Sequence, residues 1–480
     1  MTRNKTTLAI LTMILLLSGA VVYAQWTPIA VEEDPLVRMP GTQPGMATLE
    51  GPGRCLNCHE DYNHSVEPGF NWKGSMMAQA SRDFLFWACM TVAAQDSIWA
   101  VDSPNATDIC ERCHFPIGWV EGRSDPTNAS LMKGDDYDGV NCDFCHNLYD
   151  PFFEDTYHGV REGEDWLSYW DETNLSATPS DASALETYQE DSLLVQSIPL
   201  FSGNAFFGTD NKPVYSTYSV NAGGQYFVSP NGQKRSSFAD AEARHQMLYS
   251  RYHKSKYYCS TCHDISNPVL ANLGLSDLPN QDIVPSDGTD LITEQYPSWM
   301  YFHVERTFSE FMLSDYGKQG GAAGIGPFAP ESFETSDPGN NISKCQDCHM
   351  RDVAGTGANK RGIPYRPDES VEHPNSGVPL HDMTGGNAWV SWVLASAMPD
   401  SPNFVQGNYD LLNQGPAALT LDMTAGQSAD PVAILAGVDR SKQQLLLAAS
   451  LNDLVFVPAS GALSFKVQNQ TGHKPVSYTH

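Results

Sequence analysis

The sequence predicts a mainly helical fold with extensive irregular loops, ending in the start of a β-rich module. Three observations support this class. Five short Cys-x-x-Cys-His motifs are spread over residues 55–349, with long inserts between them. Several apolar runs have the length and spacing of helices, and residues 454–469 alternate apolar and polar side chains as strands do. The length of 480 residues is enough for two or three domains.

Residues 1–24 have the pattern of a secretory signal peptide. Arg3 and Lys5 precede an apolar run, and small residues at Val22 and Ala24 suit cleavage before Gln25. The alternative, an uncleaved membrane anchor, is disfavoured because the apolar run is too short to span a bilayer. We therefore expect an exported protein, in the periplasm or at the cell surface, without a transmembrane segment after cleavage.

The first half of the mature chain combines extended segments with one apolar helix. Residues 25–54 are rich in Pro and Gly and predict extended chain. A buried helix is expected from Ser75 to Gln95, with Cys89 inside it as a small buried hydrophobe. Residues 150–235 read as an irregular insert with one or two hairpins, inside a domain that we place at 25–410.

The second half predicts four helices and two strands. Ser237 opens an amphipathic helix that runs to Tyr258, and a loop rich in Pro and Asp follows to about Pro297. Further helices are expected at 302–316, 387–398 and 430–452. The last of these and the two strands after it form a C-terminal segment, 411–480, which ends as though a β domain were cut short.

The five motifs have the spacing that attaches a c-type haem. Two thiols add covalently to the two vinyl groups of a haem, and the following imidazole becomes an axial ligand of the iron. The motifs use ten of the 11 cysteines, which also disfavours zinc ribbons, since five such units cannot all pair. We therefore expect five covalent haems, stacked and wrapped by the chain, on these residues: Cys55, Cys58, His59; Cys110, Cys113, His114; Cys142, Cys145, His146; Cys259, Cys262, His263; Cys345, Cys348, His349.

The second axial ligand of each iron decides whether that haem carries electrons or offers an open position for catalysis. Nine histidines lie outside the motifs, which is enough for five irons. His245 and His253 stand eight residues apart on the predicted helix, so they would lie about 80° and roughly 12 Å apart and serve two different haems. Met76 and Met77 are in an apolar helix, where Met usually fills the core.

Several sequence blocks resemble a family of exported multihaem c-type cytochromes from environmental bacteria. They are W-K-G-S-M-M-A-Q-A from Trp72, C-E-R-C-H-F-P-I-G-W-V-E-G-R-S from Cys110, D-G-V-N-C-D-F-C-H from Asp138, H-K-S-K-Y-Y-C-S-T-C-H-D-I-S-N-P from His253, C-Q-D-C-H-M from Cys345 and H-D-M-T-G-G-N-A-W from His381. The resemblance covers most of residues 50–400. It implies that the distal ligands are Met77, His245, His253, His381 and His473. After Lys474 the chain departs from the family pattern around His473.

The leading functional hypothesis is an electron carrier in an exported respiratory or extracellular chain, working with redox partner proteins and other cytochromes. A multihaem oxidoreductase that acts on a small nitrogen or sulfur oxyanion at one open haem is the first alternative, so the sequence does not decide whether the protein is an enzyme. A subunit of a conductive cytochrome filament is the second.

The distribution of charged residues bears on the partners and ions that the protein could bind. Lys and Arg total 28 against 57 Asp and Glu, a formal charge of −29, which disfavours nucleic acid and anionic lipid as partners. Asp135 and Asp138 belong to a short acidic run that offers ligands for calcium, but such a run is more often a solvated loop.

Overall fold

The structure is a computed structural model, and it describes residues 41–97, 107–149, 182–195, 198, 225–266, 303–368, 376–414 and 421–473, apart from positions 239, 240, 242, 319, 336 and 338. The fold is mainly helical with small two-stranded sheets, as the sequence predicts. The predicted signal peptide and the loop at 268–297 lie outside these residues, as does most of the insert at 150–235. No helix within the described ranges is long and apolar enough to cross a membrane.

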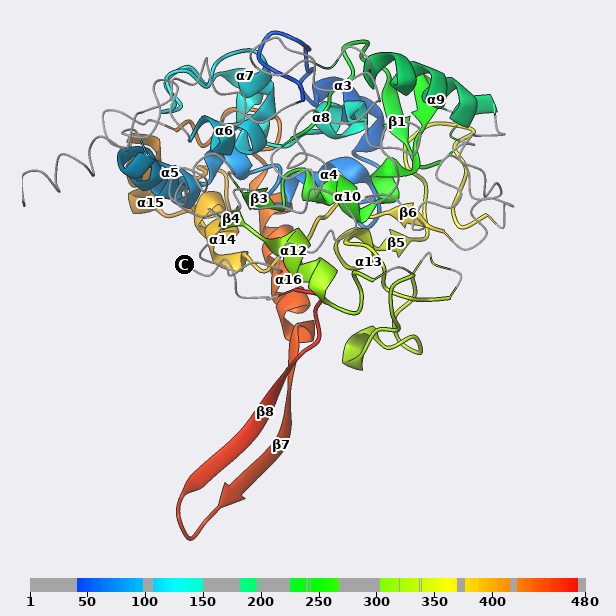
Figure 1. The fold of residues 1–480 in the computed structure, drawn as a ribbon. Helices are drawn as coiled ribbons and strands as arrows, with labels where there is room; N and C mark the ends of the chain where they lie inside the picture. The colour runs from blue at the N-terminus through cyan, green and yellow to red at the C-terminus, as the bar shows by residue number, and fades with distance from the viewer. Residues whose placement is uncertain are drawn as a thin grey trace, which may run out of the picture.

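Each Cys-x-x-Cys-His motif lies on or beside a very short helix. The helices have four to seven residues, which is far below the length at which an isolated helix is stable in water. Their order must therefore come from packing against one another and against the chain around them. Figure 1 shows them gathered in the body of the molecule: α3 Gly53–His59, α6 Asp108–His114, α8 Cys142–Asn147, α10 Lys256–Ser260 and α13 Gln346–His349.

The helix expected from Ser75 begins later than predicted. After α4 (Pro68–Lys73) the chain makes turns and a 3₁₀ helix, η1 (Ala80–Arg82), before α5 (Phe84–Ser97). Asp83 fixes the start, because its carboxylate accepts the backbone N–H groups of Leu85 and Phe86 at 2.9 and 3.2 Å. The expectation that Cys89 is buried is wrong, since its side chain is exposed on α5.

The prediction of a long amphipathic helix from Ser237 to Tyr258 is wrong. The chain instead forms strand β2 (Met247–Tyr249), a 3₁₀ helix η5 (Arg251–Lys254) and then α10. Strand β2 pairs in parallel with β1 (Lys234–Ser236), and a buried ion pair of 2.7 Å between Arg235 and Asp191 ties β1 to helix α9 (Ala182–Val195). This tertiary pairing overrides the local helical pattern, and α9 adds a helix to the insert that was expected to be irregular.

The remaining elements follow the predictions more closely. The helix expected at 302–316 is shortened to α12 (Thr307–Leu313), because β4 (His303–Glu305) before it pairs with β3 (Ile265–Ser266). A third small sheet joins β5 (Asp352–Val353) to β6 (Val378–Pro379). Helix α14 (Ala388–Ser396) confirms the expectation at 387–398, and α15 (Gln406–Gln414) follows it.

The C-terminal helix and the two strands are present, but the helix ends at Leu447 rather than Asn452, and the first strand begins at Ala449. Helix α16 (Pro431–Leu447) begins at a proline after the capping carboxylate of Asp430 and packs against α14 and α4. Gly437 permits this packing, because a Cβ there would collide with the carbonyl oxygen of Gly74. Strands β7 (Ala449–Val457) and β8 (Ala462–Asn469) then form an antiparallel hairpin that projects away from the body (Figure 1).

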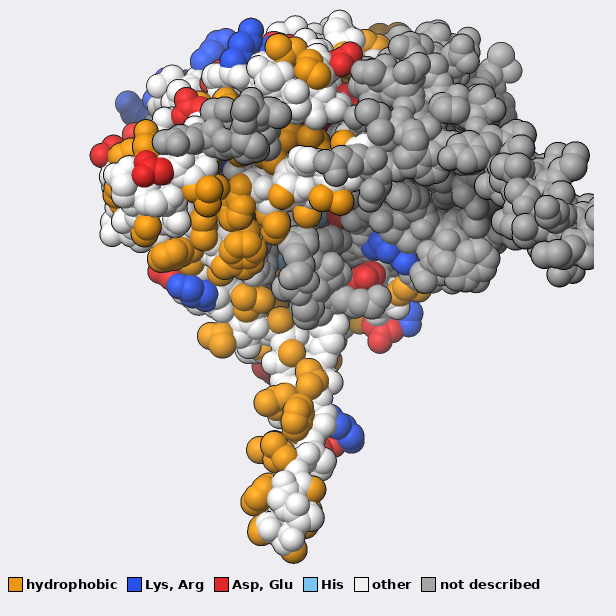
Figure 2. Space-filling model, turned by 90° about the vertical axis from the view of Figure 1, so that its left-hand side faces the viewer, with side chains coloured by type: hydrophobic (Ala, Val, Ile, Leu, Met, Phe, Trp, Pro, Cys, Tyr) orange, Lys and Arg blue, Asp and Glu red, His pale blue; other side chains and the backbone are white. Residues whose placement is uncertain are grey.

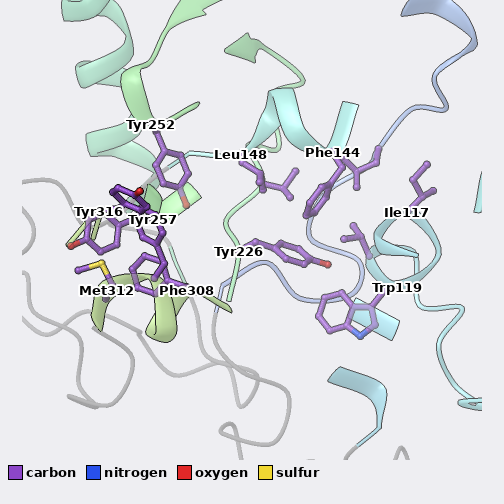
Figure 3. Packing of buried hydrophobic residues seen from close by; sticks show 14 of the residues in the cluster. Ile117, Trp119, Phe144, Leu148, Tyr226, Tyr252, Tyr257, Phe308, Met312 and Tyr316 are labelled. Carbon is purple, nitrogen blue, oxygen red and sulfur yellow. The ribbon is translucent and has the colours of Figure 1, made fainter. Parts of the chain in front are cut away.

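The largest described core cluster brings together segments that are far apart in the sequence. Tyr226 lies between Leu148 and Trp119 in Figure 3, and its ring meets the ring of Phe144 edge-on at 4.8 Å. Tyr257 of α10 and Phe308 of α12 pack at the other side of the same cluster. This cluster therefore connects α8 with α10, and Cys348 of α13 packs against it.

Candidate functional site

Four of the five motif imidazoles are held by a backbone carbonyl oxygen at Nδ1. A carbonyl oxygen only accepts hydrogen bonds, so each of these rings must carry its proton on Nδ1. The lone pair of Nε2 is then left for a metal, which is the tautomer that an axial ligand needs. The contacts are His59 to Gly357 at 2.7 Å, His114 to Ala80 at 3.4 Å, His146 to Arg235 at 2.7 Å and His349 to Thr384 at 2.6 Å.

Two of the predicted distal histidines lie with their rings nearly parallel to the ring of a motif histidine and separated from it by a gap. The ring centres of His146 and His381 lie 6.2 Å apart, and those of His349 and His473 lie 6.1 Å apart. Rings in direct stacking contact lie much closer, as Phe86 on His114 does at 3.7 Å. A metal held by two imidazoles needs about 2 Å to each nitrogen and roughly 1 Å more to each ring centre, about 6 Å in all. Both gaps therefore have the size that one metal ion between two rings requires.

His381 has the same internal arrangement as the motif histidines. Its Nδ1 donates to the carbonyl oxygen of Pro379 at 2.8 Å, which leaves its Nε2 for a metal. The short strand pair between β5 and β6 fixes this segment, because Pro379 is the last residue of β6.

His253 and His245 are placed differently from the prediction, because the helix that was to carry both does not form. His253 lies on η5, with its ring 5.4 Å from that of His146 and its Nε2 3.0 Å from the carbonyl oxygen of Cys145. His245 is exposed, yet it is close enough to His59 to contribute to the lowered pKa of that imidazole, after burial. His253 therefore lies beside the third motif, and His245 lies near both the first and the third, so the assignment of these two histidines to different haems stays a prediction.

The two adjacent methionines have different surroundings. Met76 packs in the cluster that contains Cys110 of the second motif, and its sulfur accepts a hydrogen bond of 3.0 Å from the Ser391 hydroxyl of α14. The carbonyl oxygen of Met77, the residue that the resemblance implies as a ligand, accepts the N–H of Val140 at 2.9 Å. Both methionines lie on the turn that precedes Ala80, whose carbonyl holds His114.

Burial keeps the candidate ligands neutral. It lowers the pKa of His114, His349 and His381 to about 4 and that of His253 to about 3. These imidazoles therefore carry no charge near neutral pH, and a neutral ring is the form that binds a metal.

Burial also raises the pKa of three motif thiols, to about 12 for Cys110, about 11 for Cys145 and about 12 for Cys348. Such thiols stay protonated, unlike the thiolates of zinc sites and redox disulfides. Within the described part of the chain, no group of three or more His, Cys, Asp or Glu side chains is arranged to hold a metal ion.

Thiols from different motifs touch one another. The side chains of Cys55 and Cys142 are hydrogen-bonded, which joins the first motif to the third. Cys262 of the fourth motif contacts Cys113 of the second, and Cys259 contacts Cys345 of the fifth. The fourth motif therefore lies between the second and the fifth.

Hydrogen bonds repeat two of these connections and add one between the third and the fourth motif. The Tyr258 hydroxyl, next to the fourth motif, donates to the carbonyl oxygen of Cys145 in the third at 2.9 Å. Gln346 of the fifth motif donates to the carbonyl oxygen of Ser255 at the start of α10 at 2.8 Å. Near the first motif, the N–H of Glu50 donates to the carboxylate of Asp143 in the third at 2.7 Å. The five motifs thus form one connected group.

The second motif contains two buried charged residues. The Arg112 guanidinium lies between the rings of Trp119 and Tyr226, 4.4 and 4.2 Å from their centres. Glu111 is fully buried, neither of its carboxyl oxygens has a hydrogen-bond partner in the structure, and burial raises its pKa to about 10. Sequence reasoning gave neither residue a role.

The acidic run at residues 135–138 forms a 3₁₀ helix, η2 (Gly134–Asp138), in which Asp135 is exposed while Asp136 and Asp138 are buried. The Asp138 carboxylate is buried and accepts hydrogen bonds from the N–H and hydroxyl of Ser428, both at 2.7 Å. Asp136 forms a buried ion pair with Arg123. Both carboxylates therefore hold the fold together.

Comparisons with protein-family models, with curated proteins and with solved structures found no match to this chain. The residues themselves therefore carry the functional argument.

Proposed function

We propose that this chain is an exported multihaem c-type cytochrome that carries electrons through five covalently attached haems. The observation that supports the proposal is the arrangement of the motif imidazoles. Four of them donate from Nδ1 to a backbone carbonyl oxygen, and two of these four have a second imidazole whose ring centre lies 6.1 or 6.2 Å away. Neither a zinc ribbon nor a redox disulfide calls for such an arrangement.

In this proposal the cysteines and the two sets of histidines have different roles in binding the haems. The ten motif cysteines anchor the cofactor, and the five motif histidines supply the proximal ligands. His381 would complete the site of His146, His473 that of His349 and His245 that of His59, to which it is close enough to affect the pKa. The remaining candidates are the methionines at 76 and 77 and His253, although Nε2 of His253 donates to the carbonyl oxygen of Cys145. The haems, when bound, supply the redox chemistry, and the chain sets their spacing and excludes water.

The contacts between motifs support an electron path with a definite order. It would run from the first site to the third and the fourth, and from the fourth to both the second and the fifth. Attachment points in direct contact place neighbouring cofactors close enough for rapid electron exchange. The acidic surface, with its formal charge of −29, favours basic redox partners.

The test is low-temperature electron paramagnetic resonance of the oxidised mature protein, with haem and protein quantified on the same sample. We expect five haems per chain, with every iron low-spin. A protein that holds zinc or no cofactor would refute the proposal. One high-spin haem whose spectrum shifts on adding nitrite, hydroxylamine or sulfite would favour the oxidoreductase instead.

A further inference from the structure

The second motif has no distal histidine beside it among the described residues. Within that part of the chain, the only imidazole whose charge acts on the pKa of His114 is that of His263, the motif histidine of the fourth site. The distal candidates that the structure describes lie beside the first, third and fifth motifs: His245, His253, His381 and His473. The described residues therefore offer the second site a ligand of another kind.

Met76 brings a thioether to the surroundings of this motif. Its side chain and that of Cys110 pack against the same core cluster, in which Trp87 is fully buried. Phe86 packs against this cluster as well, and its ring stacks on the imidazole of His114 at 3.7 Å. A thioether sulfur is a ligand that haem iron accepts opposite an imidazole.

The sulfur of Met76 is held by a hydroxyl group. The Oγ of Ser391, on α14, lies 3.0 Å from this sulfur and 3.2 Å from the carbonyl oxygen of Asn387, so its one proton serves either acceptor. Helix α14 lies with α5 on the side of the molecule that Figure 2 shows. A thioether is a weak acceptor, and a methionine that only fills a core needs no hydroxyl. Because one lone pair of the sulfur accepts this bond, the second remains for a metal.

Met77, the neighbouring methionine, is held only by its backbone. Its carbonyl oxygen accepts the N–H of Val140 at 2.9 Å, while its sulfur accepts no hydrogen bond from the described residues. The carbonyl oxygen of Ala80, three residues further on, accepts Nδ1–H of His114 at 3.4 Å. The backbone of this turn is thus fixed to the second motif and to the approach of the third, and Met76 is the member of the pair whose sulfur is oriented.

We propose that the sulfur of Met76, rather than that of Met77, is the second axial ligand of the haem at the second motif, with Ser391 as its positioning residue. This inference rests on the proposed function. The first, third and fifth sites each pair two imidazoles in that proposal. A thioether opposite an imidazole raises the reduction potential of the iron. The second haem is then the high-potential member of the group.

The place of the second motif among the others gives this potential a role. The second motif meets the group through the fourth, by the contact of Cys113 with Cys262, so it lies at one end of the electron path. Electrons that enter at haems of lower potential collect at the haem of highest potential. The second site is therefore the end of the path at which electrons wait for an acceptor.

The first test compares the two methionines in the full-length, haem-loaded protein. Met76→Leu should change about a fifth of the haem from low-spin to high-spin, whereas Met77→Leu should leave every haem low-spin. Leucine keeps the apolar volume of methionine, and Ser391 keeps the carbonyl of Asn387 as its acceptor, so both variants should fold. The measurement is integrated electron paramagnetic resonance. A fully low-spin Met76→Leu protein, or a high-spin haem in Met77→Leu, overturns the assignment.

The second test addresses the positioning residue through the reduction potential. Met76→His should keep the haem low-spin and lower its potential, because an imidazole replaces the thioether. Ser391→Ala should also keep it low-spin and lower the same potential by a smaller amount, because a hydrogen bond to the sulfur draws electron density away from the iron. Both changes should appear at one haem of the five in a spectroelectrochemical titration.

Ser396→Ala is the matched control for Ser391→Ala. Ser396 is a fully buried serine of the same helix, and its hydroxyl donates to the carbonyl oxygen of Val393 at 2.7 Å. This variant should leave all five potentials unchanged. An unchanged potential in Ser391→Ala, or an equal shift in Ser396→Ala, overturns the role of Ser391. Haem is quantified on every sample, so a parent protein without five haems refutes the proposed function, whereas a fully loaded parent with bis-imidazole ligation throughout refutes only this inference.

Discussion

His381 offers the sharpest test of the site, because the structure pairs it with one motif histidine. We consider His381→Ala, which removes an imidazole whose ring centre lies 6.2 Å from that of His146. Its Nδ1 donates to the carbonyl oxygen of Pro379, which leaves the lone pair of Nε2 for a metal. The variant should therefore take away the sixth ligand of one haem and leave its covalent attachment unchanged.

The size of the effect follows from the number of motifs. One haem in five loses a strong ligand, so about a fifth of the total haem should change from low-spin to high-spin. His381→Met should keep that haem low-spin but raise its potential by on the order of 100 mV, because a thioether favours the reduced iron more than an imidazole does. The measurements are integrated electron paramagnetic resonance and a spectroelectrochemical titration.

The competing assignment is equally testable. His253 also lies near His146, at 5.4 Å, but its Nε2 faces the carbonyl of Cys145. If His253→Ala produces the high-spin haem at this site and His381→Ala does not, the argument from ring spacing is refuted. A high-spin fraction of about two fifths in His381→Ala would also contradict it, because only one site should lose a ligand.

Three further predictions address the rest of the site. Cys259→Ala with Cys262→Ala should leave four haems and slow electron exchange among them, as mass spectrometry and flash reduction would show, because the fourth motif contacts the second and the fifth. Asp138→Ala should lower the free energy of unfolding by about 3 kcal/mol in urea, since it leaves the buried Arg82 without its carboxylate. Glu111, with a pKa of about 10, keeps a proton that the unfolded chain releases above pH 4.5. Stability should therefore fall by up to about 1.4 kcal/mol per pH unit between these values, and Glu111→Gln should remove that slope.

Each of these has a control on an exposed residue of the same kind. Cys89→Ala should retain five haems, Asp135→Ala should leave stability within about 0.5 kcal/mol of the parent, and Glu121→Gln should not alter the pH slope. The reasoning fails if the exposed and the buried members of a pair behave alike.

The sequence names the candidate ligands of the site but not their arrangement in space. The Cys-x-x-Cys-His spacing names the candidate ligands because the chemistry needs adjacent residues. The order in which the motifs meet depends on contacts such as Cys55 with Cys142, which join distant parts of the chain. The backbone carbonyl groups that orient the imidazoles cannot be predicted from the sequence either, because every residue has a carbonyl group.

The fold was predicted where local signals and tertiary contacts agree. Helix α16 has a proline at its start and a capping carboxylate, and the hairpin has period-two alternation, so both were found. The segment 237–258 has a helical pattern, but pairing of β2 with β1 and the cap of Ser255 on α10 impose a different structure. Asp83 is an N-cap residue by type, and it would have predicted the start of α5 at Phe84 rather than at Ser75.

The shortness of the motif helices links folding to cofactor attachment. A helix of four to seven residues has little stability of its own, and these helices are held by contacts between thiols, by buried aromatic rings and by carbonyl–imidazole bonds. Haem attachment would replace the thiol contacts with covalent links to a large apolar group at the same positions. The chain before attachment is therefore expected to be loosely packed around its motifs, and the final packing of the core should follow the cofactors rather than precede them.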